Sequence, residues 1–340
     1  MAKTKDKTIK KISSCRSCGS KSLADVMSLG KLFISAFIDE EEQKNMEKYP
    51  LDLVLCNASA GGCGLVQLAH TVPLEVLYKN YWYRSGTNKT MTEELRSIVL
   101  RAKKLIPSLA AGDLVLDIGC NDGTLLRAYG GGGIKRVGFE PSKNLAPVAA
   151  LGATKIINDF FNFRAWEKEF PGRKAKIITA IAMFYDLDDP NAFVADVVKC
   201  LDKDGVFIIQ MSYLPLMLRD CAFDNICHEH LEYYSLSSLE HLLTRHSLEV
   251  FDVETNDTNG GSFRIFVKHK GGGTTIKIVA GAEDRLAKMQ NEENNLKLNE
   301  RKIYDDFVSR VEQVKTKIQD FVKNEVLNGK KVYVYGASTK

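Results

Sequence analysis

The chain has 340 residues, of which 44% are hydrophobic and 26% are charged, and its formal net charge at pH 7 is +4. This length predicts a globular protein of two or three domains. The small net charge, with Lys and Arg interleaved among Asp and Glu, argues against a nucleic-acid surface, and no stretch approaches the roughly 18 apolar residues that a membrane span requires. We therefore expect a cytoplasmic protein with a small-molecule ligand and no nucleic-acid or membrane partner.

Two cysteine pairs predict a metal site within residues 1–75. Cys15 and Cys18 are separated by two residues, Cys56 and Cys63 are separated by six, and a glycine follows each pair. Cysteines of a cytoplasmic chain stay reduced, which favours metal ligation over disulfides. Four thiolates complete a tetrahedron around Zn²⁺ and leave no position for water, so the predicted zinc is structural. The alternative is two pairs of buried cysteines without a metal.

Residues 76–105 are expected to form a connecting loop and a helix, and residues 106–258 have the pattern of an α/β domain. The segments DLVLDIG, IKRVGFE, TKIINDFF, AKIITAIAMFY and GVFIIQMSY are apolar, and helical segments separate most of them. This alternation predicts a parallel, doubly wound sheet. Two more strands, SLEVFDVE and GSFRIFVKH, are joined by a short loop and predict an antiparallel hairpin at the sheet edge. The pattern predicts a seven-stranded, Rossmann-like class I methyltransferase domain.

The turn after the first of these strands is the predicted cofactor site. It contains Asp117, Gly119, Asn121 and Gly123 in the sequence DIGCNDG, and this glycine spacing differs from the G-x-G-x-x-G that binds a pyrophosphate. The spacing favours S-adenosylmethionine over NAD. Glu140 ends the second strand, 21 residues after Gly119, where a carboxylate can accept both ribose hydroxyls.

Two further residues are candidates for contacts with the cofactor: Asp159, which we expect to end the third strand, and the adjacent Phe160. For both carboxylates, Glu140 and Asp159, the alternative is a solvated strand end without a ligand.

The loop CHEHLEYYS at residues 227–235 carries more titratable groups than a connection needs. It follows the fifth strand, at the sheet edge where ligands bind in this architecture. Ser237 and Glu240 are spaced as a capping box, which predicts where the next helix begins. A neutral histidine is suited to the role of general base near pH 7. The alternatives are a His-x-His metal site and a structural histidine in the core.

The motifs CGLVQL, YWYRSG, DIGCNDGTLL, GFEPS, DFFN, MFYDLDDP, HEHLEYYS, GGSFR and VYVYGASTK occur in this order along the chain. Together they resemble those of the three-domain C-methyltransferases that act on nucleotide-linked keto sugars. The resemblance covers nearly the whole chain. It implies a zinc domain, an S-adenosylmethionine domain and a Rossmann-like C-terminal domain that completes the substrate pocket. It also implies methyl transfer to the carbon beside a ketone, usually C3 of a 4-keto-6-deoxy sugar.

The resemblance also implies roles for single residues. His230 is implied as the base that takes the proton, and Glu229 as a group that orients an imidazole or binds substrate hydroxyls. The loop that includes Tyr83 is implied to close over the cofactor, with packing between domains as the alternative for this aromatic segment. Three further side chains are implied as contacts to the oxyanion or the sugar: His228, Tyr185 and Tyr233. Tyr185 replaces a histidine of the best-known sugar enzymes and Cys227 replaces a tyrosine, so the reaction class carries over better than the exact substrate.

The remaining residues, 259–340, are expected to begin the C-terminal substrate domain. Apolar residues at helical spacing between about residues 280 and 327 predict one or two long amphipathic helices. The last segment, GKKVYVYGASTK, predicts a strand and a glycine turn, and we expect the domain to be truncated there, unless this strand pairs with a partner. Two other functions remain open: an O- or N-methyltransferase for a small molecule, and an inactive binding protein with zinc-ribbon and methyltransferase-like parts.

Overall fold

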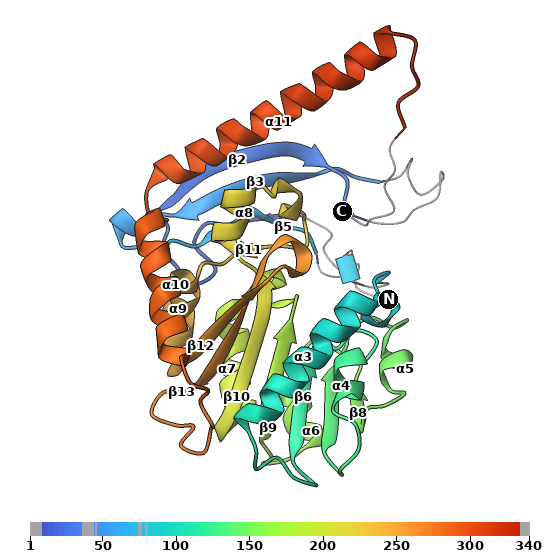
Figure 1. Ribbon diagram of the computed structural model, residues 1–340, viewed down its shortest axis with the longest axis vertical. Helices are drawn as coiled ribbons and strands as arrows, with labels where there is room; N and C mark the ends of the chain where they lie inside the picture. Colours follow the sequence, from blue (N-terminus) through green and yellow to red (C-terminus); the bar gives the residue numbers. More distant parts are fainter. Residues whose placement is uncertain (1–8, 36–43, 45, 74–76, 79–80, 334–340) are drawn as a thin grey trace, which may run out of the picture.

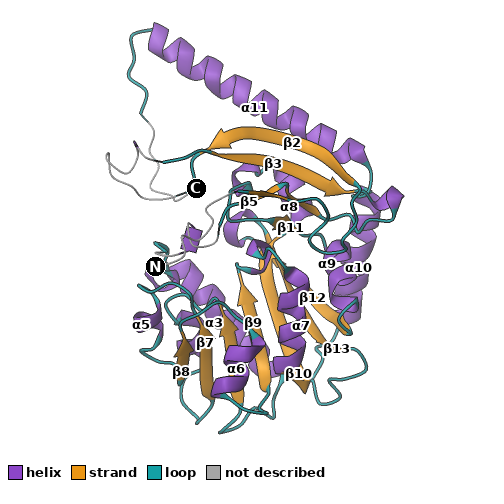
Figure 2. Cartoon of the chain, turned by 180° about the vertical axis from the view of Figure 1, so that it is seen from behind, coloured by secondary structure: helices purple, strands orange, loops and turns teal. Residues whose placement is uncertain are grey.

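The computed structural model describes residues 9–35, 44, 46–73, 77–78 and 81–333 (Figure 1). A large sheet with helices on both faces forms one part of the molecule, and a second, curved sheet lies beyond the carboxyl ends of its parallel strands (Figures 1 and 2). The strand predicted near the last residues falls mostly beyond residue 333, outside the described residues. Within the described ranges, no helix is long and apolar enough to cross a membrane.

The large sheet has the seven strands that the sequence predicts. Its order is β12-β13-β10-β9-β6-β7-β8, in which β6 to β10 run parallel and β13 pairs antiparallel with both β10 and β12. The predicted hairpin at the edge is therefore confirmed. The strands are β6 (Leu114–Ile118), β7 (Lys135–Phe139), β8 (Lys155–Ile157), β9 (Ala175–Ile181), β10 (Leu201–Ser212), β12 (Leu248–Asn256) and β13 (Ser262–His269). Because β8 ends at Ile157, Asp159 lies in the following loop and not at the strand end.

Helices cover both faces of this sheet. α3 (Lys89–Leu105) and α4 (Thr124–Ala128) pack on one face, whereas α6 (Phe163–Glu169), α7 (Pro190–Cys200) and α9 (Leu236–Thr244) pack on the other. In α3 the buried residues Leu95, Ile98, Val99 and Ala102 are three or four positions apart, which places them on one helix face. α5 (Ala146–Ala149) lies near β8, and α10 (Ala282–Leu296) packs against α9 and β12.

The second sheet has four strands in the order β11-β4-β3-β2, and all neighbours are antiparallel. Three strands come from the N-terminal segment: β2 (Leu23–Leu32), β3 (Tyr49–Cys56) and β4 (Val66–Leu68). The fourth, β11 (Glu232–Tyr233), belongs to the CHEHLEYYS loop. A separate ladder joins β1 (Lys10–Lys11) to β5 (His70–Thr71). The loop that carries the predicted base is therefore also a strand of the N-terminal sheet.

Two helices pack on this second sheet, namely α8 (Leu214–Asp220) and α11 (Arg301–Leu327). Tyr304, Phe307 and Val311 of α11 are buried, whereas Ile318 and Phe321 of the same helix are exposed. The prediction of one or two long amphipathic helices is confirmed, and the structure has two, α10 and α11. Short 3-10 helices lie at η1 (Ala58–Ala60), η2 (Ser85–Thr87), η3 (Phe184–Asp186), η4 (Phe223–Asn225) and η5 (Thr258–Gly260).

The start of α9 differs from its prediction. The helix begins at Leu236, and its capping box joins Ser235 and Ser238 instead of Ser237 and Glu240. The Ser235 hydroxyl accepts a hydrogen bond from the backbone N–H of Ser238, and the Ser238 hydroxyl accepts one from the N–H of Ser235. A serine at the third helical position can replace the usual Glu or Gln because its oxygen reaches back to the same N–H. The CHEHLEYYS loop thus runs directly into the helix.

Candidate functional site

The four predicted zinc ligands lie together. Their sulfur atoms are all within 4.8 Å of one another, with 3.7 Å between the sulfurs of Cys15 and Cys63 and 3.4 Å between those of Cys18 and Cys56. A tetrahedral shell with Zn–S bonds of about 2.3 Å separates its sulfurs by about 3.8 Å. These cysteines therefore fit a structural Zn²⁺. Within the described part of the chain they form the one cluster of three or more such ligating groups, and neither His228 nor His230 belongs to it.

The loop between Cys56 and Cys63 brings the two sulfurs together although six residues separate them. A Cβ on Gly62 would lie 2.5 Å from the sulfur of Cys56, so this position accepts glycine alone. The hydrogen bond from Cys63 lowers the pKa of the Cys15 thiol to about 4, which makes Cys15 a thiolate at neutral pH. Thiolates are the form in which cysteine binds zinc.

The predicted cofactor turn joins β6 to α4 at the carboxyl edge of the large sheet. Gly119 has φ +69° and Gly123 has φ +78°, a region that favours glycine. A Cβ on Gly119 would lie 3.2 Å from Cγ of Met183, and one on Gly123 would lie 2.8 Å from the Ala149 carbonyl oxygen. The turn therefore lies close to the loop after β9 at Gly119 and to α5 at Gly123, and at both positions a residue without a side chain fits best.

Glu140 follows β7 and is 4% exposed. One of its carboxylate oxygens accepts the N–H of Asn121, and the other accepts the N–H of Ser142, both at 2.8 Å. Burial raises the pKa of this carboxyl group, while the two backbone hydrogen bonds act in the opposite direction. A carboxylate offers about four acceptor sites, so Glu140 keeps capacity for the two hydroxyls of a ribose.

The other predicted cofactor residues lie in different surroundings. Asp117 is buried beneath the turn, where it accepts a hydrogen bond of 2.6 Å from the Thr179 hydroxyl, and burial raises its pKa to about 7. Asp159 and Phe160 are exposed in the loop after β8. The neighbouring Asn158 donates to the Glu140 carbonyl at 2.7 Å, so this loop lies beside Glu140.

The backbone of the segment with Tyr83 is hydrogen-bonded to side chains of the cofactor turn. The Asn121 amide donates to the Tyr83 carbonyl oxygen at 2.9 Å and accepts the N–H of Ser85 at 3.0 Å. The Gly86 N–H donates to the Asp122 carboxylate at 2.9 Å. The Tyr83 side chain remains 38% exposed. These hydrogen bonds hold the loop that contains Tyr83 against the turn.

The predicted base, His230, is 5% exposed and lies next to Tyr185. Its Nδ1 is 2.8 Å from the carbonyl oxygen of Asn225, and its ring centroid is 4.2 Å from that of Tyr185. Tyr185 belongs to η3, two residues after Met183, whose Cγ would lie 3.2 Å from a Cβ on Gly119. The loop after β9 thus connects the cofactor turn to the histidine.

The other predicted catalytic residues separate into two groups. His228 points into the second sheet, where its Nε2 is 3.0 Å from the Tyr49 carbonyl, and burial lowers its pKa. Tyr233 lies on the His230 side, with its hydroxyl 3.5 Å from the Asn225 carbonyl. Glu229 is half-buried, and its Oε2 has no hydrogen-bond partner among the described residues. His228 therefore lies in a packed structural position, whereas Glu229 and Tyr233 lie near His230.

Sequence reasoning assigned no role to three polar residues beside this site. The Tyr78 hydroxyl donates to Asp186 at 2.9 Å, and the Tyr78 ring lies 5.7 Å from that of Tyr81. Burial raises the pKa of both tyrosines, and the Asp186 and Glu229 carboxylates add to the rise. The sequence hinted at two of these residues, because Tyr81 lies in the motif YWYRSG and Asp186 lies in the motif MFYDLDDP. Tyr78 lies in neither motif.

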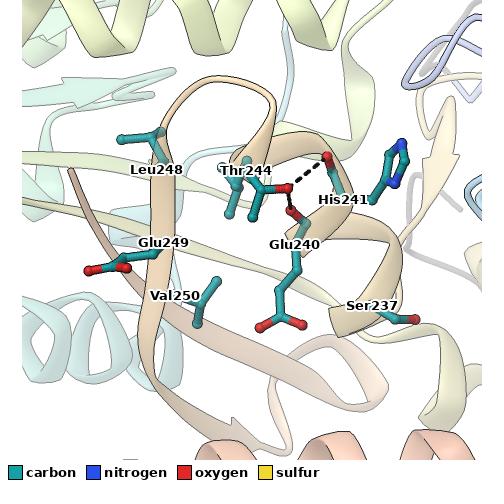
Figure 3. A pocket seen from close by; sticks show the side chains of 8 residues that line it. Ser237, Glu240, His241, Thr244, Leu248, Glu249 and Val250 are labelled. Carbon is teal, nitrogen blue, oxygen red and sulfur yellow. Dashed lines mark hydrogen bonds between the residues drawn. The ribbon is translucent and has the colours of Figure 1, made fainter. Parts of the chain in front are cut away.

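A surface pocket of about 380 Å³ lies elsewhere, between α9 and the start of β12 (Figure 3). None of the predicted site residues lines it. Its lining residues are Ser237, Glu240, His241, Leu243, Thr244, Leu248, Glu249 and Val250.

Comparisons with known proteins agree with this arrangement. Three family models match the chain: a zinc binding domain over residues 15–78, a methyltransferase domain over residues 87–253 and a C-methyltransferase C-terminal domain over residues 257–340. The C-methyltransferase NovU of Streptomyces niveus is 31% identical over 336 residues, which are 98% of this chain and 77% of NovU.

Solved methyltransferase structures are more distant. Magnesium protoporphyrin IX methyltransferase of Synechocystis PCC 6803, with bound SAH, matches with a TM-score of 0.41 and 13% identity over 57% of this chain and 91% of that one. An S-adenosylmethionine-dependent methyltransferase of Clostridium acetobutylicum matches with a TM-score of 0.39 and 15% identity over 52% and 91% of the two chains.

Proposed function

The chain belongs to the zinc-containing, S-adenosylmethionine-dependent C-methyltransferases, and from this premise we propose that it methylates the carbon next to the ketone of a nucleotide-linked keto-deoxy sugar. The sugar substrate rests on the sequence motifs described above. The role of each side chain rests on the geometry of the site at the carboxyl edge of the large sheet.

The chain holds S-adenosylmethionine at the turn between β6 and α4. Glu140 accepts the ribose hydroxyls, because its carboxylate is buried and already fixed by two backbone N–H groups. The segment around Tyr83 covers the turn. When bound, the cofactor supplies a methyl group on a positively charged sulfur.

His230 is the proposed base. A carbonyl oxygen can only accept a hydrogen bond, so the contact with Asn225 places the proton of the neutral ring on Nδ1. Nε2 is then the basic nitrogen. It takes the proton from the carbon beside the ketone, and the electron pair of the broken C–H bond moves into the C–C–O system, which places negative charge on the ketone oxygen. The nucleophilic carbon then takes the methyl group.

The tyrosines next to His230 stabilise this oxyanion. Burial holds the pKa values of Tyr185 and Tyr233 well above the usual range, so both phenols stay protonated and can donate. Preorganised donors at the site of developing charge supply a large part of the catalysis in such reactions. Glu229, whose Oε2 has no partner among the described residues, is a proposed acceptor for a sugar hydroxyl.

The main observation behind this proposal is the contact of His230 with the Asn225 carbonyl. Exchange of substrate hydrogen with solvent deuterium tests the proposal. With S-adenosylhomocysteine and a nucleotide-linked 4-keto-6-deoxy sugar in D₂O, the enzyme should catalyse deuterium uptake at the carbon beside the ketone. His230→Asn should slow this uptake by about 100- to 10,000-fold and leave S-adenosylmethionine affinity within about twofold. His241→Asn, an exposed histidine on α9, is the matched control. Uptake at the normal rate in His230→Asn would assign the base to another residue.

A further inference from the structure

Gln67 of β4 contacts the cysteine cluster with its side chain. It is fully buried, its amide nitrogen is 3.1 Å from the sulfur of Cys15, and its amide oxygen accepts the backbone N–H of Arg16 at 3.1 Å. An N–H that donates to a metal-bound thiolate orients the ligand and tunes its charge. Gln67 is therefore the outer partner of one zinc ligand.

The backbone of the same residue holds the strand next to the proposed base. β4 lies between β3 and β11, and Gln67 pairs directly with Glu232. The adjacent Leu68 N–H donates to the carbonyl of Leu231 at 2.9 Å. Leu231 immediately follows His230, so the ladder reaches the residue after the base.

The cysteine cluster is also fixed to the large sheet. The Asn191 side chain of α7 donates to the carbonyls of Arg16 and Ser17 at 2.9 and 2.7 Å, within the turn from Cys15 to Cys18. Tyr234, at the end of the CHEHLEYYS loop, is fully buried in the same core cluster as Cys15 and Cys56. The cluster therefore touches both the scaffold that holds the cofactor and the loop that holds His230.

We propose that Gln67 is a positioning residue that couples zinc binding at the four cysteines to the placement of β11 and of His230. Zinc fixes the sulfur of Cys15, that sulfur fixes the Gln67 amide, and the Gln67 backbone fixes β11. This role extends the zinc site beyond the stapling of the N-terminal segment. An effect of this coupling on proton transfer depends on the role proposed for His230. The effect on the order of β11 does not depend on that role.

Backbone amide exchange, measured by mass spectrometry on the whole zinc-loaded chain, tests the coupling. Gln67→Met removes the three side-chain hydrogen bonds of Gln67 at similar volume, and Gln290→Met, which removes the hydrogen bond from Gln290 on α10 to Glu240 on α9, is the matched control. We expect Gln67→Met to raise exchange at residues 230–234 more than tenfold. We expect no change at residues 119–123 and one bound zinc per chain. Zinc removal from the unaltered chain by a chelator should raise exchange at residues 230–234 in the same way, and in Gln67→Met it should add much less.

Two outcomes would overturn the coupling. One is exchange at residues 230–234 that neither zinc removal nor Gln67→Met alters. The other is an equal rise at residues 119–123, which would indicate general destabilisation. If Gln67→Met does not fold, Gln67→Glu serves as the second variant, because it keeps the acceptor for Arg16 and replaces the donor to Cys15 by a carboxylate oxygen that repels the thiolate. A normal exchange pattern in Gln67→Glu would likewise reject the coupling. If exchange at residues 230–234 responds as expected but proton transfer by the unaltered chain does not depend on His230, the role of His230 is contradicted and the coupling stands.

Discussion

The imidazole of His230 lies against the phenol ring of Tyr185, with 4.2 Å between centroids and 53° between the ring planes. The contact joins the loop after β9 to the loop after β10. Burial, with the Asp186 carboxylate as a smaller contribution, raises the pKa of Tyr185 well above its usual value, so this phenol keeps its proton. The pair therefore places a proton acceptor beside a proton donor, as the formation and stabilisation of an enolate require.

Tyr185→Phe keeps the ring against His230 and removes the donor. We expect methyl transfer to fall by about 100- to 1,000-fold, the usual cost of one lost oxyanion donor, while S-adenosylmethionine affinity stays unchanged. Single-turnover kinetics and calorimetry measure the two quantities. Tyr185→His, which restores an N–H donor on a smaller ring, should recover part of the rate. Full activity in Tyr185→Phe would assign the oxyanion contact to another residue such as Tyr233.

Glu140→Ala should weaken S-adenosylmethionine binding by more than about tenfold, because hydrogen bonds to a charged group contribute about 1.5 to 3 kcal/mol each. Calorimetry of Glu169→Ala, a surface carboxylate paired with Lys155, provides the control. Burial raises the pKa of Glu140, so its protonation on acidification begins at a higher pH than for an ordinary glutamate. Affinity should therefore fall in that pH range as the carboxylate is lost. An affinity equal to that of the control would place the ribose elsewhere.

Asp117→Asn should change the pH dependence of stability. Burial raises the pKa of Asp117 from 3.8 to about 7, so the folded chain holds this proton more tightly than the unfolded chain does. The resulting stabilisation is complete below pH 3.8 and is lost as the pH rises through about 7. The variant does not titrate here, and its stability relative to the unaltered chain should rise by roughly 2 to 3 kcal/mol between pH 5 and pH 8.

Urea unfolding without ligand at these two pH values measures the difference for Asp117. A constant difference between Asp117→Asn and the unaltered chain across this range would show that the carboxyl group is ionised in the folded chain at both pH values.

Replacement of Cys15 and Cys56 by Ser together should reduce bound zinc from about one to about zero per chain, since each cysteine supplies one of four ligands. Metal analysis by mass spectrometry measures this. Cys221→Ser, at the end of α8 and outside the cluster, should retain the metal. Zinc that survives the double replacement would contradict the proposed ligand set.

Local patterns predicted the seven-stranded sheet, the two long helices and the four-cysteine cluster, because each depends on periodicity or on spacing within a short stretch. They also identified Glu140 and the CHEHLEYYS loop as candidates, since both follow strands of one parallel sheet, whereas the choice of His230 within that loop came from the resemblance to the family. The capping box was placed two residues late because Ser237 with Glu240 fits the common pattern, whereas Ser235 with Ser238 is the pair that forms.

Contacts made by backbone groups, and contacts between segments far apart in the chain, could not be predicted because no short sequence pattern indicates them. The partner of the His230 imidazole is the carbonyl of Asn225, a group that every residue carries. The pairing of β11 with β4 joins segments far apart in the chain, and β11 has only two residues. The position of His228 against Tyr49 follows from that pairing, so the sequence could not distinguish its environment from that of His230.

The pairing of β11 with β4 also constrains the order in which the chain can fold. During synthesis the first 75 residues emerge with β2, β3 and β4, but the strand that completes their sheet follows β10. Until then the outer edge of β4 exposes its backbone N–H and C=O groups, and an open edge is prone to pairing with other chains. Expressed as a separate fragment, the zinc-binding segment would retain this open edge. The sheet has all four of its strands only after β6 to β10 of the methyltransferase sheet have been made, so the N-terminal segment can complete its fold only late in synthesis.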